Sequence, residues 1–452
     1  MFPRACLGLF FLLSPCCVWC QVDTSGVNTS GTEAATNPGG EVPMRTPPPV
    51  SGGAYSTAFA SETESNYWSA GLKVSTGYTN DAEQAETLKP IGSVFYSIWP
   101  TFALNATTTR LNAFLTYDPG VTFYQSASAR NQFNQNLALD FQYQLSPRVT
   151  ISLEDLFWMT SNPFDQPNPL LATPVSGSVP APELGVIAPV ADQLHNAANV
   201  QLTYQIRADS MIGLGGTFTN LHYTNPAEVS GLYNSNSTGG SVFYSRRVRE
   251  KHYLGVSYRY MDVLASQTGV PSSATQVQTV FLFCTLYLKP TLSLSLSGGP
   301  QHYDAAQPPL PASRSWSPLA MASLGWQGQR TSLAASYSQI VTGGGGLAGA
   351  YHLNTANASG RWQVSRTWNA GLSAGYWLYK TVTPFFFGSS SGGHTVFETA
   401  TIERPLGQHL TVQVGYTAVQ QLYGGIAAMS AYPNINRGFV SISYQFRKPL
   451  TR

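Results

Sequence analysis

Charged residues are few in this chain, and several stand at alternate positions among amides and hydroxyls. The charged members of this pattern are Lys73, Asp140, Glu154, Arg259 and Arg361. The amide members are Asn112, Gln142, Gln201, Gln205, Asn357, Gln363 and Gln413. Alternate side chains of an extended strand share one face. They therefore predict a polar lumen-facing surface whose charges either select the ions or sugars that approach, or simply hydrate the face and pair across it.

Motifs for catalysis or metal binding are weak. Residues 344–349 match G-x-G-x-x-G in form, but no strand and helix pattern frames them, so an external loop is favoured. The seven histidines show no metal-ligand spacing. We expect no enzyme, no cofactor and no metal, although a Ser or Asp brought beside a His at a barrel rim would leave no local motif.

The element that must position the polar residues is an alternating run of about ten residues, repeated from Tyr67 onwards. Residues 136–145, NLALDFQYQL, place apolar and polar side chains on opposite faces. Residues 291–297, TLSLSLS, do the same with leucine and serine. A soluble sheet and a membrane barrel both fit this alternation, so the turns have to distinguish them.

Short and long connections between the runs alternate along the chain. Short ones are predicted at 106–110, 146–148, 207–210, 289–291, 328–330 and 365–367, and long ones at 79–92, 162–194, 224–240, 304–318 and 381–393. Outer-membrane barrels have short periplasmic turns and long extracellular loops. The sequence therefore predicts an all-β fold, a single transmembrane antiparallel up-and-down β-barrel of about 18 strands (16–18), wide enough to hold water.

Composition and the N-terminus agree with a barrel in the bacterial outer membrane. Charged residues make up 10% of the chain, against about 25% in soluble proteins. Residues 1–20 predict a secretory signal peptide, 21–66 a flexible arm and 67–452 the barrel. Four of the five cysteines lie in 1–20, with acylation of Cys20 a lesser alternative, so no disulfide framework is expected and Cys284 is interpreted as a small hydrophobe.

Aromatic residues near the ends of the runs are expected to form the interfacial girdles of the barrel. They are Trp158, Tyr204, Tyr258, Tyr260, Trp362, Tyr376, Tyr444 and Phe446. The last run, 438–446, is typical of a strand recognised by the barrel-assembly machinery, although RKPLTR follows it. The basic segment 246–251 is expected to be a solvated turn, and a net charge of +2 does not indicate a nucleic-acid partner.

Three segments make the chain resemble the outer-membrane β-barrel porin family of diderm (Gram-negative-type) bacteria, whose genes often lie beside surface-polysaccharide genes. They are GLKVSTGYTND (71–81), RLNAFLTYDPGVTFYQ (110–125) and QLSPRVTISLEDLFWMTSNPF (144–164). The resemblance implies a location in the outer membrane, contact with its lipid and lipopolysaccharide, and a surface polysaccharide as a candidate partner.

Two functions are compatible with these features. The first is a porin-like channel for passive diffusion of small hydrophilic solutes or saccharides. The alternative is a closed or export-type barrel that acts in surface-polysaccharide secretion or binding through its long loops. Within the channel hypothesis, the Pro-rich segment 162–194 is expected to constrict the pore. Unpaired Lys73, Arg259 and Arg361 predict a weak anion preference, or passage of an acidic sugar polymer, unless Asp140 and Glu154 cancel their charge.

Overall fold

The computed structural model describes most of the predicted barrel. The described residues are 66–82, 90–128, 131–160, 192–224, 232–249, 252–267, 270–289, 291–309, 311–342, 350–382, 392–424 and 434–450. This part of the chain is built from strands and contains no α-helix. None of its segments is a helix long and apolar enough to cross a membrane.

The described residues form 18 antiparallel strands in one sheet. They are β1 (Tyr67–Thr79), β2 (Ser93–Thr107), β3 (Leu111–Tyr124), β4 (Gln132–Ser146), β5 (Val149–Thr160), β6 (Gln193–Arg207), β7 (Ser210–Tyr223), β8 (Asn234–Arg249), β9 (His252–Gln267), β10 (Val270–Lys289), β11 (Leu292–Ala306), β12 (Ser313–Gln327), β13 (Thr331–Thr342), β14 (Tyr351–Gln363), β15 (Asn369–Thr381), β16 (Gly392–Pro405), β17 (Leu410–Gly424) and β18 (Asn434–Pro449).

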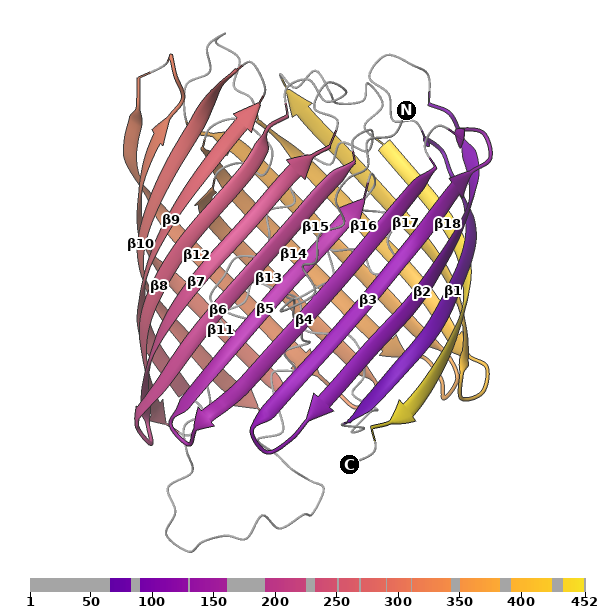
Figure 1. Ribbon diagram of the computed structural model, residues 1–452, viewed down its shortest axis with the longest axis horizontal. Helices are drawn as coiled ribbons and strands as arrows, with labels where there is room; N and C mark the ends of the chain where they lie inside the picture. The colour runs from indigo at the N-terminus through magenta and orange to yellow at the C-terminus, as the bar shows by residue number, and fades with distance from the viewer. Residues whose placement is uncertain are drawn as a thin grey trace, which may run out of the picture.

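Each strand pairs with its neighbours in sequence, and β1 also pairs with β18 along its whole length, from Tyr67 opposite Pro449 to Thr79 opposite Arg437. This pairing closes the sheet into a barrel of tilted strands, which Figure 1 shows from the side. Closure leaves no edge strand, so every strand has a hydrogen-bonded neighbour on both sides. The predicted single up-and-down barrel of about 18 strands is confirmed.

The turns at the end where β1 begins and β18 ends are tight, as predicted. Only Pro147 and Arg148 separate β4 from β5, and only Ala208 and Asp209 separate β6 from β7. At the other end, 161–192 separate β5 from β6. In bacterial barrels, the short turns are periplasmic and the long loops extracellular, which sets the orientation of the chain.

Several predicted loop boundaries are wrong because strands extend beyond the sequence pattern. The expected loop 224–240 is too long, since β8 already starts at Asn234. Likewise, β11 continues to Ala306 and β12 starts at Ser313, within the expected loop 304–318. The extra residues are mostly Ser, Asn, Asp and Arg, whose polar side chains hide the alternation where the strands rise above the apolar band.

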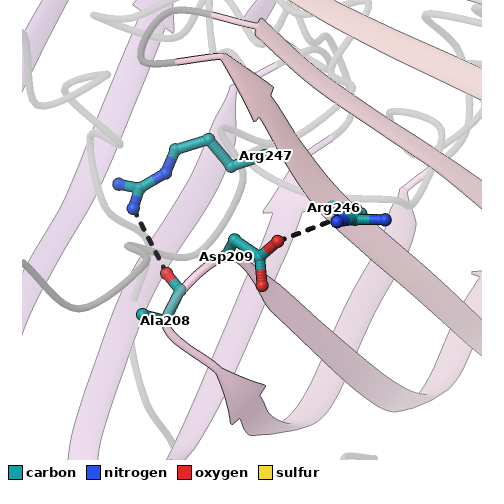
Figure 2. A network of polar contacts seen from close by, with 4 residues as sticks. All are labelled: Ala208, Asp209, Arg246 and Arg247. Carbon is teal, nitrogen blue, oxygen red and sulfur yellow. Dashed lines mark hydrogen bonds and ion pairs between the residues drawn. The ribbon is translucent and has the colours of Figure 1, made fainter. Parts of the chain in front are cut away.

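The basic segment 246–251 is also partly strand, because β8 runs to Arg249. Its arginines hold the neighbouring β6–β7 turn (Figure 2). The Arg246 Nε donates to Asp209 Oδ2 at 3.1 Å, and the Arg247 Nη2 donates to the Ala208 carbonyl oxygen at 3.4 Å. The two arginines point to opposite faces of β8, so they fasten the turn from both sides of the wall.

The two faces of each strand have different environments. In the TLSLSLS segment, Ser295 is 3% exposed and Leu296 is 42% exposed. Large exposed aliphatic and aromatic side chains recur at alternate positions around the barrel, from Leu72 on β1 to Ile442 on β18. A closed barrel with such a band outside presents it to lipid. The leucines therefore face the membrane and the serines face the lumen.

The lumen face also carries large aromatic rings, which the alternation of apolar and polar residues does not predict. Several rings lie against a glycine directly opposite on the next strand, so that a Cβ built on the glycine would meet the ring. These pairs are Gly77 with Phe95, Gly213 with Phe243, Gly255 with Phe283, Gly375 with Phe397 and Gly415 with Phe439. The Trp99 ring on β2 likewise lies against Gly120 of β3. A ring that lies flat on a glycine occupies less of the lumen than one that stands out from the wall.

Four sequence predictions lie wholly or almost wholly outside the described residues. They are the signal peptide 1–20, the arm 21–66 up to its last residue, the external loop 344–349, and the constricting segment 162–194 up to its last three residues. Of the last segment, Gln193 and Leu194 begin β6.

Candidate functional site

All the predicted lumen-facing residues lie on the inner face of the barrel. Register partners in an antiparallel pair point to the same side of the sheet. Lys73, between exposed Leu72 and Val74, is therefore inward, and the cross-strand pairings place the others on the same face. They are Asn112, Asp140, Gln142, Glu154, Gln201, Gln205, Arg259, Asn357, Arg361, Gln363 and Gln413.

Strands β3 to β6 form a wall rich in carboxylates and amides. Asp140 and Glu154 are direct cross-strand partners, and two like charges in this position repel each other. The Asn199 Nδ2 donates to Glu154 Oε2 at 3.4 Å. Asp118, on β3, lies opposite Asn136 of β4 on the same face. This wall concentrates negative charge on one side of the lumen.

The lumen-facing cations on β1 and β14 are held by ion pairs or hydrogen bonds. Arg361, on β14, forms an ion pair with Glu403 on β16. The Lys73 Nζ donates to Gln413 Oε1 at 3.1 Å, and the Ser441 Oγ donates to the same oxygen at 3.3 Å. The expectation that Arg361 is an unpaired cation is therefore wrong, because the barrel brings strand β16 within reach of β14.

Two other lumen-facing arginines stack on aromatic rings. The Arg259 guanidinium carbon lies 5.5 Å from the centroid of the Phe281 ring. The Arg437 guanidinium carbon lies 3.6 Å from the centroid of Phe95, the ring that also lies against Gly77. Arg437 is only 7% exposed. Arg437 was not predicted from the sequence, although it lies an even number of residues from the lumen-facing positions of the final strand.

Asp118 and Glu403 were also missed. Asp118 precedes Pro119, so that Asp-Pro-Gly in β3 looks like a turn, although the strand continues through it. Glu403 stands near the end of β16, where the sequence pattern gives no clear strand boundary. Alternation counted from Phe114 and from Phe397, which both face the lumen, is the signal that could have found them.

The prediction that Trp158 belongs to an aromatic girdle is wrong. Trp158 is 2% exposed and lies on the lumen face, because its register partners are Asn136 and His195. Residues two apart along a strand share a face, and Trp158 follows the inward residues Glu154 and Leu156 at that spacing. The other girdle candidates point outward, with Trp362 at 54% and Tyr444 at 50% exposure; these are Tyr204, Tyr258, Tyr260, Trp362, Tyr376, Tyr444 and Phe446.

Asp155 and Glu398 are two of the carboxylates that the register places on the outer face. Asp155 accepts a hydrogen bond from the Asn196 Nδ2 at 2.9 Å. Glu398 is exposed in the middle of β16, between Ala374 of β15 and Ala418 of β17. A carboxylate at this depth is unfavourable because lipid does not solvate it.

Within the described ranges, no three or more His, Cys, Asp or Glu side chains lie close enough together to hold a metal ion. Cys284, on β10, is a free thiol of intermediate exposure. The polar side chains of the lumen can attract, repel or hydrogen-bond a solute.

Comparison with known proteins adds fold likenesses at low identity. No family model matches the chain, and no curated protein matches it. Pseudomonas aeruginosa OpdQ is 9% identical over 85% of this chain and 99% of its own, with a TM-score of 0.40. Acinetobacter baumannii OccAB4 is 10% identical over 85% of this chain and 99% of its own, with a TM-score of 0.39.

The class of the protein follows from the barrel itself. A closed antiparallel wall of 18 strands, apolar outside and polar inside, with tight turns at the end where the wall begins and ends, defines an outer-membrane β-barrel. The protein is thus a transmembrane β-barrel of the outer-membrane type.

Proposed function

We propose that this barrel is a channel for passive diffusion of small hydrophilic solutes. The observation that carries the proposal is the inward face of a closed 18-strand wall, which presents charges and amides such as Asp140, Glu154 and Lys73 to the lumen. A wall that merely filled a core would place apolar side chains there. A barrel of this strand number has room for water.

The hydrophilic path follows the wall of β3 to β6. That wall carries most of the lumen amides and three lumen carboxylates, Asp118, Asp140 and Glu154. Strands β7 to β17 instead contribute a cluster of buried apolar side chains, including Phe281, Leu353 and Phe397. A polar solute therefore moves along β3 to β6, where it can exchange hydrogen bonds with water for bonds with the wall.

The experiment is reconstitution of the purified, folded protein in planar bilayers and in liposomes. Stepwise ion conductance and swelling in a small sugar are expected, whereas heat-unfolded protein at the same dose is expected to give neither. Heat-modifiable gel mobility confirms that the sample is folded. A folded barrel that inserts into the bilayer and never conducts would rule out the channel.

The alternative, a closed or export-type barrel that secretes or binds surface polysaccharide, depends on long loops that lie mostly outside the described residues. A folded, non-conducting barrel that retains polysaccharide would favour it. In either case, we propose that lipopolysaccharide and membrane lipid surround the barrel, and that strand β18 (Asn434–Pro449) presents the signal to the assembly machinery. The strand includes Arg447 and Lys448, which the sequence pattern places after its end.

A further inference from the structure

The inner wall of β3 to β7 has a group of buried polar atoms, at its extracellular end, that lack hydrogen-bond partners. These atoms are Thr122 Oγ1, Asn134 Nδ2 and Oδ1, Asn136 Oδ1, Trp158 Nε1, His195 Nδ1 and Tyr223 Oη. Elsewhere in the described part of the barrel, such atoms are single hydroxyls or lone amides. The group therefore differs from the rest of the lumen in both number and chemistry.

Register brings these side chains together. Asn136, Trp158 and His195 form one cross-strand row over β4, β5 and β6. The Trp158 and His195 rings meet edge to face, with centroids 4.6 Å apart and an interplanar angle of 67°. Asn134 is the next inward residue on β4, and Tyr223 is the partner of Gln193, the inward residue beside His195 on β6.

The side chains are well buried: Asn134 is 0% exposed, Trp158 2% and His195 3%. Native proteins leave few buried polar groups unsatisfied, and each exception asks for a missing partner such as water, an ion or a ligand. The backbone of these strands is already paired in the sheet. Because the strand backbone is already paired, the partner of these side chains is water or a ligand that enters the covered space beside them.

We propose that this row, named here the β4–β6 row (Asn134, Asn136, Trp158 and His195), is a binding site for neutral saccharides. The proposal rests on the proposed function, since the saccharide reaches the row through the lumen. Amide, indole and imidazole groups offer both donors and acceptors, which matches sugar hydroxyls that donate and accept. The adjacent rings provide the apolar surface that small-molecule sites combine with a few convergent polar groups.

The carboxylates near the β4–β6 row favour a neutral saccharide over an acidic one. Asp118 is the cross-strand partner of Asn136, and Asp140 lies on the same face of β4, two inward positions along the strand. The β4–β6 row itself contains no Lys or Arg. An acidic sugar would therefore meet repulsion with no compensating cation, whereas a neutral sugar would not.

The test uses maltotriose as the neutral probe and trigalacturonate as an acidic probe of equal length. Binding to the folded full-length protein in detergent is measured by titration calorimetry, and reversible block of the ion current is measured in bilayers. The variants are Trp158→Phe, which keeps a ring and removes the unpartnered Nε1, and Asn134→Ala. The matched control is Trp377→Phe, because the Trp377 Nε1 on the inner face of β15 already donates to Asn357 Oδ1 at 3.3 Å.

We expect maltotriose to bind the native protein and trigalacturonate not to bind. Trp158→Phe and Asn134→Ala should each raise the Kd for maltotriose by about five- to tenfold, as loss of one neutral hydrogen bond does. Trp377→Phe should change the Kd by less than about twofold. Without sugar, both test variants should still form the barrel, with a lower thermal stability because each removes packing atoms from a buried row.

Absence of calorimetric binding, or equal effects of all three variants, would overturn the proposal and leave ordered water as the only partner of the row. A barrel that conducts ions but does not bind maltotriose would retain the proposed channel and lose this site. A folded barrel that binds maltotriose but never conducts would retain the site and lose the channel. Heat-modifiable mobility excludes variants that fail to fold.

Discussion

At the scale of single residues, the opposed carboxylates Asp140 and Glu154 dominate the charge of the β3 to β6 wall. We predict that the double change Asp140→Asn and Glu154→Gln shifts selectivity toward anions. Because the two carboxyl groups repel each other, they carry about one charge between them. One charge about 10 Å from a passing ion acts on it by roughly 0.4 kcal/mol in water, which is about a twofold change in its local concentration. Reversal potentials in a salt gradient at low ionic strength measure the shift, which should shrink as salt is added.

The Arg361–Glu403 pair permits a sharper electrostatic test because both members lie in the lumen. Arg361→Gln alone should move selectivity toward cations, and Glu403→Gln alone toward anions. The double variant should return close to the native reversal potential, because the two changes cancel in net charge. A double variant that keeps the full effect of either single change would place one of the two side chains away from the ion path.

The sequence predicts which side of the wall a residue faces wherever the alternation of inward and outward side chains along its strand is enough to decide this. Alternation within each strand is enough to place Lys73, Arg259 and Gln413 on the inner face. It is not enough to show that Arg361 meets Glu403, because that contact depends on the register of β14, β15 and β16. Trp158 shows the opposite error, since its residue type suggested a membrane interface and its parity was not applied.

At the scale of elements, the aromatic rings that lie on glycines set the shape of the inner wall. On β7, a Cβ built at Gly213 would come within 2.1 Å of the Phe243 ring, whereas one at Gly216 would meet nothing within 4 Å. We predict that Gly213→Ala forces the Phe243 ring away from the wall, costs about 1–3 kcal/mol of stability and lowers the single-channel conductance. Gly216→Ala is the control on the same strand and should change neither quantity.

Unfolding by urea in detergent, followed by loss of heat-modifiable mobility, gives the stability of these variants, and bilayer recordings give the conductance. Equal stability of the Gly213 and Gly216 variants would show that the Phe243 ring moves aside at no cost. The sequence could not predict this arrangement because it shows a glycine and an aromatic ring more than twenty positions apart. Only the register of β7 and β8 makes them opposite neighbours.

At the scale of the whole molecule, the number of strands and the closed barrel follow from features that are repeated along the chain. Each alternating run of about ten residues matches the thickness of a membrane, and tight turns recur at one end. The strand ends above the apolar band were less predictable, as β8 and β12 show, because polar residues on both faces remove the alternation. Long-range closure of β1 onto β18 was predictable only from the need to pair two edges.

The outer surface of the molecule provides the last prediction, because Glu398 interrupts the apolar band. It is exposed in the middle of β16 and flanked by Ala374 and Ala418. Glu398→Ala should stabilise the barrel by about 1 kcal/mol, since a carboxylate on the lipid face is unfavourable at this depth, though less so than Lys or Arg. Glu403→Gln on the same strand should instead destabilise it, because Arg361 then loses its charged partner. Urea unfolding of both variants in lipid vesicles measures the two effects, and a loss of stability in Glu398→Ala would mean that this carboxylate has a partner in the membrane.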